Sequence, residues 1–264
     1  MTLLAIESAT DTVGVALVRD DGASAERIHE GGRAHAELLV PAIEEVCAAS
    51  GCTIGEVSRI AVDVGPGLFT GLRVGVATAK ALAQALGIGV LGVSSLDILA
   101  ASVAERSSSM AVGAVVAVVD ARRGEVFASA YRFDRVDGGA PPPDPETVRD
   151  GRLEPVRPDA LVDWLVGVAE ETGRVPVVGD GAVRYRHLLS VHASLDLRWA
   201  EELSAPPPLA QARLALRRLG RGVLPLEAAE VVPDYRRPAD ARINWEQRAP
   251  RSVGRHVEQG DAPR

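Results

Sequence analysis

The feature that most constrains the fold is a strand, a glycine-rich loop and a helix that follow one another across residues 61–87. The helix, residues 72–86, carries two charged side chains, Arg73 and Lys80, and is apolar over nearly all of its circumference. A helix that lies on a sheet needs one apolar face, so this helix must be covered on two sides. The loop before it either holds a phosphate at the helix N-terminus or permits close packing of the helix.

Strands and helices alternate along the rest of the chain, which predicts an α/β protein. The expected strands are residues 2–6, 12–18, 24–30, 58–64, 88–93, 111–119, 125–133 and 175–178, and the other expected helices are residues 35–50, 95–106, 158–171 and 209–219. A proline-rich surface loop is expected at residues 134–150.

A serine-rich joint at residues 107–109 divides these elements into two sets. We predict two tandem domains of related plan, residues 1–108 and 109–235, each opening with a β-hairpin, and a flexible tail over residues 236–264. This plan resembles that of the actin-like, sugar-kinase and Hsp70 superfamily, whose members bind nucleotide between two domains related by duplication.

Composition narrows the class of protein. With 264 residues and 47% hydrophobic content, the chain can form one large core or two small ones. It has no run of about 18 apolar residues, which argues against a membrane span. The net charge of −7 argues against independent binding of RNA or DNA. Cys47 and Cys52 are the only cysteines, as expected for a reduced, cytoplasmic protein.

Three motifs carry a closer resemblance. The segments GPGLFTGLRVGVATAKALA (residues 65–83), DARRGEVF (residues 120–127) and PDYRR (residues 233–237) are similar to those of the TsaB family, and the similarity extends from residue 1 to about residue 237. The resemblance implies a non-catalytic dimerisation and activating subunit in the synthesis of N6-threonylcarbamoyladenosine next to the tRNA anticodon. It implies direct binding to the TsaD transferase, a complex with the ATPase TsaE, and a homodimer when the chain is alone.

The catalytic paralogue TsaD holds a metal with two histidines four residues apart, a spacing that places both on one helix face. The matching positions here are Ser95 and Leu99, and leucine cannot bind a metal. We therefore expect no catalytic residue, no metal and no intrinsic cofactor in this chain. The resemblance places ATP with magnesium and the catalytic metal on the partner subunits, and it implies that tRNA is contacted mainly through the partner.

Two loops are candidates for a vestigial nucleotide site. Glu7, Ser8, Thr10 and Asp11 stand where the superfamily has its first phosphate loop, and Gly179 and Gly181 resemble a degenerate adenosine loop. The alternatives are a hairpin turn capped by serine and threonine, and a plain strand-to-helix turn. The turn at residues 120–125 offers arginines flanked by acids where a phosphate turn has glycines, which favours a salt-linked turn.

The charge-poor helix and the helix of residues 35–50 are the candidate partner surface. Small residues recur at every fourth position of the charge-poor helix, which lets another helix approach closely. The alternative is that the neighbouring helix of this chain supplies all the cover. The predicted interface residues are His35, Leu38, Leu39, Ala42, Ile43, Val46, Gly71, Leu72, Gly75, Val76, Ala79 and Ala83.

Two other functions stay open at this point. One is an independent nucleotide-binding enzyme of the same superfamily, either a kinase or a metallohydrolase, which ATP binding or a stoichiometric metal in the isolated chain would favour. The other is a homodimeric scaffold that acts without an enzymatic partner.

Overall fold

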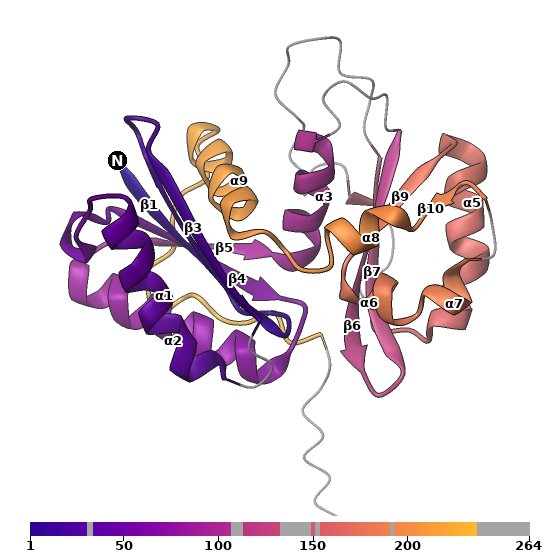
Figure 1. Cartoon of the computed structure of the whole chain (residues 1–264), viewed down its shortest axis with the longest axis horizontal. Helices are drawn as coiled ribbons and strands as arrows, with labels where there is room; N and C mark the ends of the chain where they lie inside the picture. Colours follow the sequence, from indigo (N-terminus) through magenta and orange to yellow (C-terminus); the bar gives the residue numbers. More distant parts are fainter. Residues whose placement is uncertain (31–33, 107–112, 133–148, 151–153, 191–192, 237–264) are drawn as a thin grey trace, which may run out of the picture.

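Two five-stranded sheets form the framework of the molecule (Figure 1). The structure, a computed structural model, describes residues 1–30, 34–106, 113–132, 149–150, 154–190 and 193–236. The predicted tail and nearly all of the predicted loop at residues 134–150 lie outside this part. No helix in the described ranges is long and apolar enough to cross a membrane.

The first sheet has the strand order β3-β2-β1-β4-β5. Strand β1 pairs antiparallel with β2 and parallel with β4. Helices α1 and α2 lie side by side on one face of this sheet, and α3 and α9 cover the other face (Figure 1). The strands are β1 (Thr2–Glu7), β2 (Thr12–Arg19), β3 (Ser24–Glu30), β4 (Arg59–Gly65) and β5 (Val90–Ser94), and the helices are α1 (His35–Ala49), α2 (Phe69–Leu86), α3 (Ser95–Arg106) and α9 (Pro208–Gly220).

The second sheet repeats this topology. Its order is β10-β9-β6-β7-β8, with β6 antiparallel to β7 and parallel to β9, so that β6 takes the place of β1. The strands are β6 (Ala114–Arg122), β7 (Glu125–Arg132), β8 (Arg149–Asp150), β9 (Val175–Val178) and β10 (Leu195–Asp196), and the helices are α5 (Val162–Thr172), α6 (Asp180–Arg184), α7 (Arg186–Leu189) and α8 (Arg198–Glu202). Short 3-10 helices lie at Ile54–Glu56 and Pro158–Leu161.

Helix α3 lies between the two sheets and is buried on nearly every side. Ile98 and Ala101 pack into the apolar cluster of the first sheet. Leu96 and Leu99 pack against β6 and β7 of the second sheet. The Leu99 position, which the TsaD comparison assigns to a metal ligand, is therefore part of an apolar core.

Residues 208–236 return to the first sheet, which differs from the predicted domain of residues 109–235. Helix α9 packs on β1 and β2, and the segment after it forms a backbone bridge from Leu226 to Val90. Further along, the Asp234 backbone N–H donates to the Val64 carbonyl at 2.7 Å. The apolar stripe of α9 would fit either sheet, so its pattern alone cannot assign it to one of them.

Most element positions agree with the sequence prediction. Helix α2 starts at Phe69, one turn earlier than expected, because Gly71, which looked like a loop residue, belongs to its first turn. The short elements β8, β10, α7 and α8 were not predicted, because segments of two to five residues carry too little periodicity to detect.

Candidate functional site

The loop between β1 and β2 is held against α2 by direct contacts. The Ser8 hydroxyl donates to the Gly71 carbonyl at 2.9 Å. A Cβ on Gly71 would lie 1.9 Å from the Ser8 carbonyl oxygen, and one on Gly75 would lie 2.2 Å from Ser8 Oγ. A Cβ on Gly67 would lie 2.2 Å from the Ala9 carbonyl oxygen. The glycines therefore serve close packing, and the segment they admit is this loop and not a second helix.

The donors and acceptors of the same loop are engaged inside the chain. The Ala9 backbone N–H donates to Glu7 Oε1 at 2.8 Å, so this N–H is not free to donate to a phosphate. The Thr10 carbonyl accepts a hydrogen bond from the His35 ring nitrogen Nε2 at 2.8 Å. The hydroxyl of Thr12 donates to Glu7 Oε2 at 3.3 Å. The predicted alternative of a self-contained hairpin turn describes this loop better than a phosphate loop does.

Three carboxyl groups are buried near these loops, and the Glu7 carboxyl interacts electrostatically with both of the others, Asp63 and Asp180. Burial, together with the nearby Asp63 carboxyl, raises the pKa of Glu7 well above its usual value. Burial also raises the pKa of Asp63 to about 7, although this carboxylate accepts bonds from Ser95 Oγ and the Gly65 N–H, both at 2.7 Å. Burial raises the pKa of Asp180 to about 6. Buried carboxyl groups present mainly acceptor oxygens, whereas a phosphate needs donors, and the described residues hold no cluster of acidic, histidine or cysteine side chains suited to a metal.

The turn between β6 and β7 is linked by ion pairs, as predicted. Arg122 lies 3.3 Å from Asp120 and reaches across to Asp11 of the first half at 2.7 Å. Arg122 and Arg123 have positive φ angles of 62° and 56°, a conformation that costs free energy for residues with a side chain. The strained backbone is held where the Arg122 guanidinium joins the two halves.

The two glycines of the candidate adenosine loop also have packing roles. Gly179 has a φ of 100°, and a Cβ there would lie 2.2 Å from the Val118 carbonyl oxygen. A Cβ on Gly181 would lie 3.0 Å from Val118 atoms. Both glycines let the start of α6 approach β6, which is the predicted alternative of a strand-to-helix turn.

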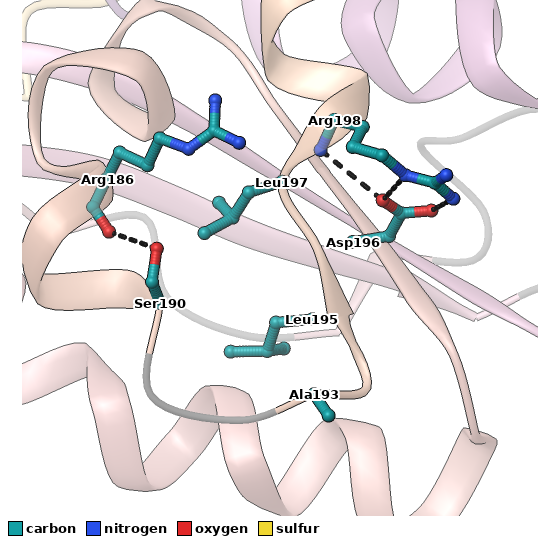
Figure 2. A pocket seen from close by; sticks show the side chains of 7 residues that line it. All are labelled: Arg186, Ser190, Ala193, Leu195, Asp196, Leu197 and Arg198. Carbon is teal, nitrogen blue, oxygen red and sulfur yellow. Dashed lines mark hydrogen bonds and ion pairs between the residues drawn. The ribbon is translucent and has the colours of Figure 1, made fainter.

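A pocket in the second half is lined by α7, β10 and the start of α8 (Figure 2). Its polar groups bind each other: Arg198 contacts Asp196 through Nε at 3.0 Å, and Ser190 Oγ donates to the Arg186 carbonyl. The Arg186 guanidinium pairs with Glu201, so the charges of the described lining residues are already engaged and these residues offer no set of convergent free groups for a ligand.

The residues predicted to contact a partner are buried in this chain. Eleven of the twelve are buried, and Leu38 is half-buried. The ridge of Gly71, Gly75, Ala79 and Ala83 faces the sheet and the β1–β2 loop. Within this chain these side chains are used for internal packing, so their assignment to an interface stays a prediction that the structure does not favour. Because α2 is apolar all round, its periodicity cannot say which face turns inward.

A second ridge of α2, offset by two residues, faces solvent. We call it the outer ridge; its members recur at every fourth position and are all exposed, namely Phe69, Arg73, Ala77, Ala81 and Ala85. On α1, Val40 is 52% exposed, and Glu37 and Glu44 flank it in the same exposed face. The two helices together present small and apolar side chains with charged margins.

The outer ridge begins in a cluster that the sequence analysis missed. The Phe69 and Tyr235 ring centroids lie 5.1 Å apart, and the Arg73 guanidinium carbon lies 3.9 Å from the Phe69 centroid. The Arg73 Nε–H donates to the Tyr235 hydroxyl at 3.1 Å. The PDYRR motif was the available signal, but nothing in the sequence connects it to a helix more than 150 residues away.

The fold and these loops define the class of protein. It is an α/β protein with two sheets, and the hydrogen-bonding groups of the loops between the sheets are already bound by groups of the same chain. A family model described as TsaD, tRNA N6-adenosine threonylcarbamoyltransferase, matches residues 27–139. The chain is 31% identical over 252 residues to the tRNA threonylcarbamoyladenosine biosynthesis protein TsaB of Bacillus subtilis, covering 93% of this chain and 98% of that protein. The chain therefore belongs to the TsaB family.

Other relatives agree with this assignment. TsaB of Escherichia coli is 32% identical over 134 residues, which cover 51% of this chain and 56% of that protein. The solved structure of YeaZ from Pseudomonas aeruginosa superposes with a TM-score of 0.67 at 26% identity, over 88% of this chain and all of that one. A second structure from that organism, described as similar to peptidase YeaZ, has a TM-score of 0.71 at 27% identity, over 89% of this chain and 99% of that one.

Proposed function

We propose that this chain is a non-catalytic subunit in the biosynthesis of tRNA N6-threonylcarbamoyladenosine, and that it binds and activates the TsaD transferase through the exposed faces of α1 and α2. The observation that carries the proposal is the outer ridge. Ala77, Ala81 and Ala85 are exposed on a helix whose opposite side is already fully packed, so the ridge is free for a second helix to approach.

The loops between the halves support a subunit that leaves the chemistry to its partner. The Ala9 N–H is held by the chain's own Glu7 carboxylate, and buried acids surround that position. ATP with magnesium and the catalytic metal then belong to partner subunits, and tRNA is bound mainly through TsaD. The shared strand order of the two sheets supports an actin-like fold that arose by duplication.

The cellular compartment and the other subunits follow from the same proposed function. The chain would work in the cytoplasm, where tRNA is modified, in a complex that also includes TsaE. In the absence of TsaD, the exposed faces of α1 and α2 would pair two copies of this chain around a two-fold axis.

The test is light scattering after size-exclusion chromatography, on this chain alone and mixed with TsaD from the same organism. A new species of equal stoichiometry is expected, with tRNA modification only when TsaD, TsaE and the activated threonylcarbamoyl donor are all present. The absence of a complex, combined with ATP hydrolysis or a stoichiometric metal in the isolated chain, would instead establish an independent enzyme.

A further inference from the structure

Phe69 and Tyr235 are unusual because they stay exposed while touching each other. They are 43% and 46% exposed, and they are the only exposed aromatic side chains in the described part of the protein. Aromatic residues make up 3% of the sequence, so their meeting on one surface is not a consequence of abundance. Exposed tyrosine, arginine and phenylalanine gathered in one patch have the composition of an interaction hot spot.

Arg73 is fixed in one orientation by these two rings. Its guanidinium plane lies over Phe69 with the carbon 3.9 Å from the ring centroid, and its Nε–H is used by the Tyr235 hydroxyl. Within the described residues, neither terminal nitrogen of Arg73 has a hydrogen-bond or ion-pair partner. A guanidinium held in this way presents a fork of N–H groups that matches the two oxygens of a carboxylate.

We infer that Phe69, Arg73 and Tyr235 form a carboxylate-binding hot spot at one end of the outer ridge, and that the PDYRR motif exists to place Tyr235 against Arg73. The inference rests on the proposed function, because the occupant is an aspartate or glutamate on the TsaD surface that covers the ridge. Tyr235 is a positioning residue in this arrangement, since it acts on the partner through Arg73.

Two observations favour a protein carboxylate over an RNA phosphate. Arg73 is a member of the outer ridge, one helical turn from Ala77, so a helix packed on the ridge passes beside it. The remaining charged side chains of the exposed α1 face, Glu37 and Glu44, are acidic and would repel RNA. They also set the orientation of the partner helix, whose acidic end must lie at Arg73 and whose basic side must lie along α1.

The segment after α9, residues 221–236, which we call the C-terminal segment, becomes part of the docking surface in this arrangement. The Asp234 N–H donates to the Val64 carbonyl, and Lys80 Nζ donates to the Ala229 and Val231 carbonyls at 3.2 and 3.1 Å. These bonds hold the segment along α2 and bring Tyr235 to the N-terminal turn of that helix. Partner binding therefore depends on two parts of the sequence that lie 162 residues apart.

The test measures the affinity of this chain for TsaD by titration calorimetry, with each variant first checked by circular dichroism and thermal unfolding. Arg73→Ala is expected to weaken binding about 30-fold, as truncation of a hot-spot side chain does. Arg73→Lys is expected to weaken it nearly as much, because an ammonium group cannot form the fork. Tyr235→Phe keeps the ring, loses the hydroxyl and is expected to weaken binding about 5-fold.

A double-mutant cycle separates positioning from a merely structural role. If Tyr235 acts through Arg73, then Tyr235→Phe has no further effect on affinity in the Arg73→Ala background. Arg184 and Tyr185, whose guanidinium carbon and ring lie 5.8 Å apart on the second half, supply the control: Arg184→Ala and Tyr185→Phe should bind TsaD as the wild type does.

The outcomes distinguish this inference from the proposed function. If the wild type does not bind TsaD, the proposed function itself fails. If the wild type binds and Ala81→Arg does not, but Arg73→Ala binds with wild-type affinity, only the hot spot is overturned. If Arg73→Ala leaves TsaD affinity unchanged and weakens tRNA binding by the complex, the fork binds a phosphate, and the carboxylate assignment is overturned.

Discussion

The two ridges of α2 both repeat small residues at every fourth position, but one is buried and the other is exposed. The inner ridge (Gly71, Gly75, Ala79 and Ala83) is buried, and two of its members could not carry a Cβ without meeting Ser8. The outer ridge repeats the four-residue spacing and stays exposed. Small residues at this spacing therefore indicate a close contact without saying whether the neighbour belongs to the same chain. A matched pair of substitutions, one on each ridge, separates the two uses.

The largest effect is expected for Ala79→Arg on the inner ridge. Ala79 is fully buried, so an arginine there would place an unpaired charge in the core and lower the free energy of unfolding by more than about 4 kcal/mol. Urea unfolding followed by circular dichroism measures this. A variant that unfolds at the wild-type urea concentration would show that the inner ridge is not the packed one.

Ala81→Arg, two residues along the same helix, is expected to leave folding intact. Ala81 is exposed, so the free energy of unfolding should change by less than about 0.5 kcal/mol. Binding to TsaD should fall by about 100-fold, because the long side chain prevents close approach of a second helix. Calorimetry with wild-type TsaD checks this, and undiminished binding would remove the outer ridge from the interface.

Asp63, which lies in β4 and accepts a hydrogen bond from Ser95 at the start of α3, predicts a pH dependence. Burial raises the pKa of Asp63 to about 7 from a usual value of 3.8, so the folded chain holds this proton more tightly than the unfolded chain does. The contribution of this proton to the free energy of unfolding is fully present below pH 3.8 and is lost as the pH rises through about 7. The melting temperature of Asp63→Asn relative to the wild type should therefore increase from pH 4 to pH 8.

Asp159 is the control for that measurement, because its exposed carboxylate is paired with the Arg157 guanidinium and its pKa is lowered. Its stabilisation is present at neutral pH and is lost as the pH falls below the usual value. Asp159→Asn should thus show no increase in relative melting temperature between pH 6 and pH 8, and an equal rise in both variants would count against the assignment to Asp63.

The smallest effect is expected for Lys80→Met, which lies between the two ridges. The variant loses two hydrogen bonds to the C-terminal segment, and we expect the free energy of unfolding to fall by about 1 kcal/mol. Thermal unfolding measures the change, with the exposed Gln84→Met as the control. No difference between the two variants would mean that Lys80 does not hold the segment.

Sequence patterns predicted the strand and helix order well, because each element carries its own periodicity. They did not predict which face of α2 turns inward, since an all-apolar helix has no marked side. They placed α9 in the second domain, since its amphipathic stripe does not identify the sheet it covers. The contact of Arg73 with Tyr235 was also missed, because long-range partners leave no trace in a single sequence.

The return of α9 to β1 and β2 has a consequence for synthesis on the ribosome. The first sheet is complete once β5 has emerged, yet the face that α3 and α9 share stays only partly covered until residues 208–220 have been translated. The second half must therefore emerge and fold while that apolar surface is exposed in the nascent chain, which is a setting for chaperone binding. A transcript truncated before α9 would yield a protein with both sheets encoded, but without the last cover helix and without the Tyr235 of the inferred hot spot.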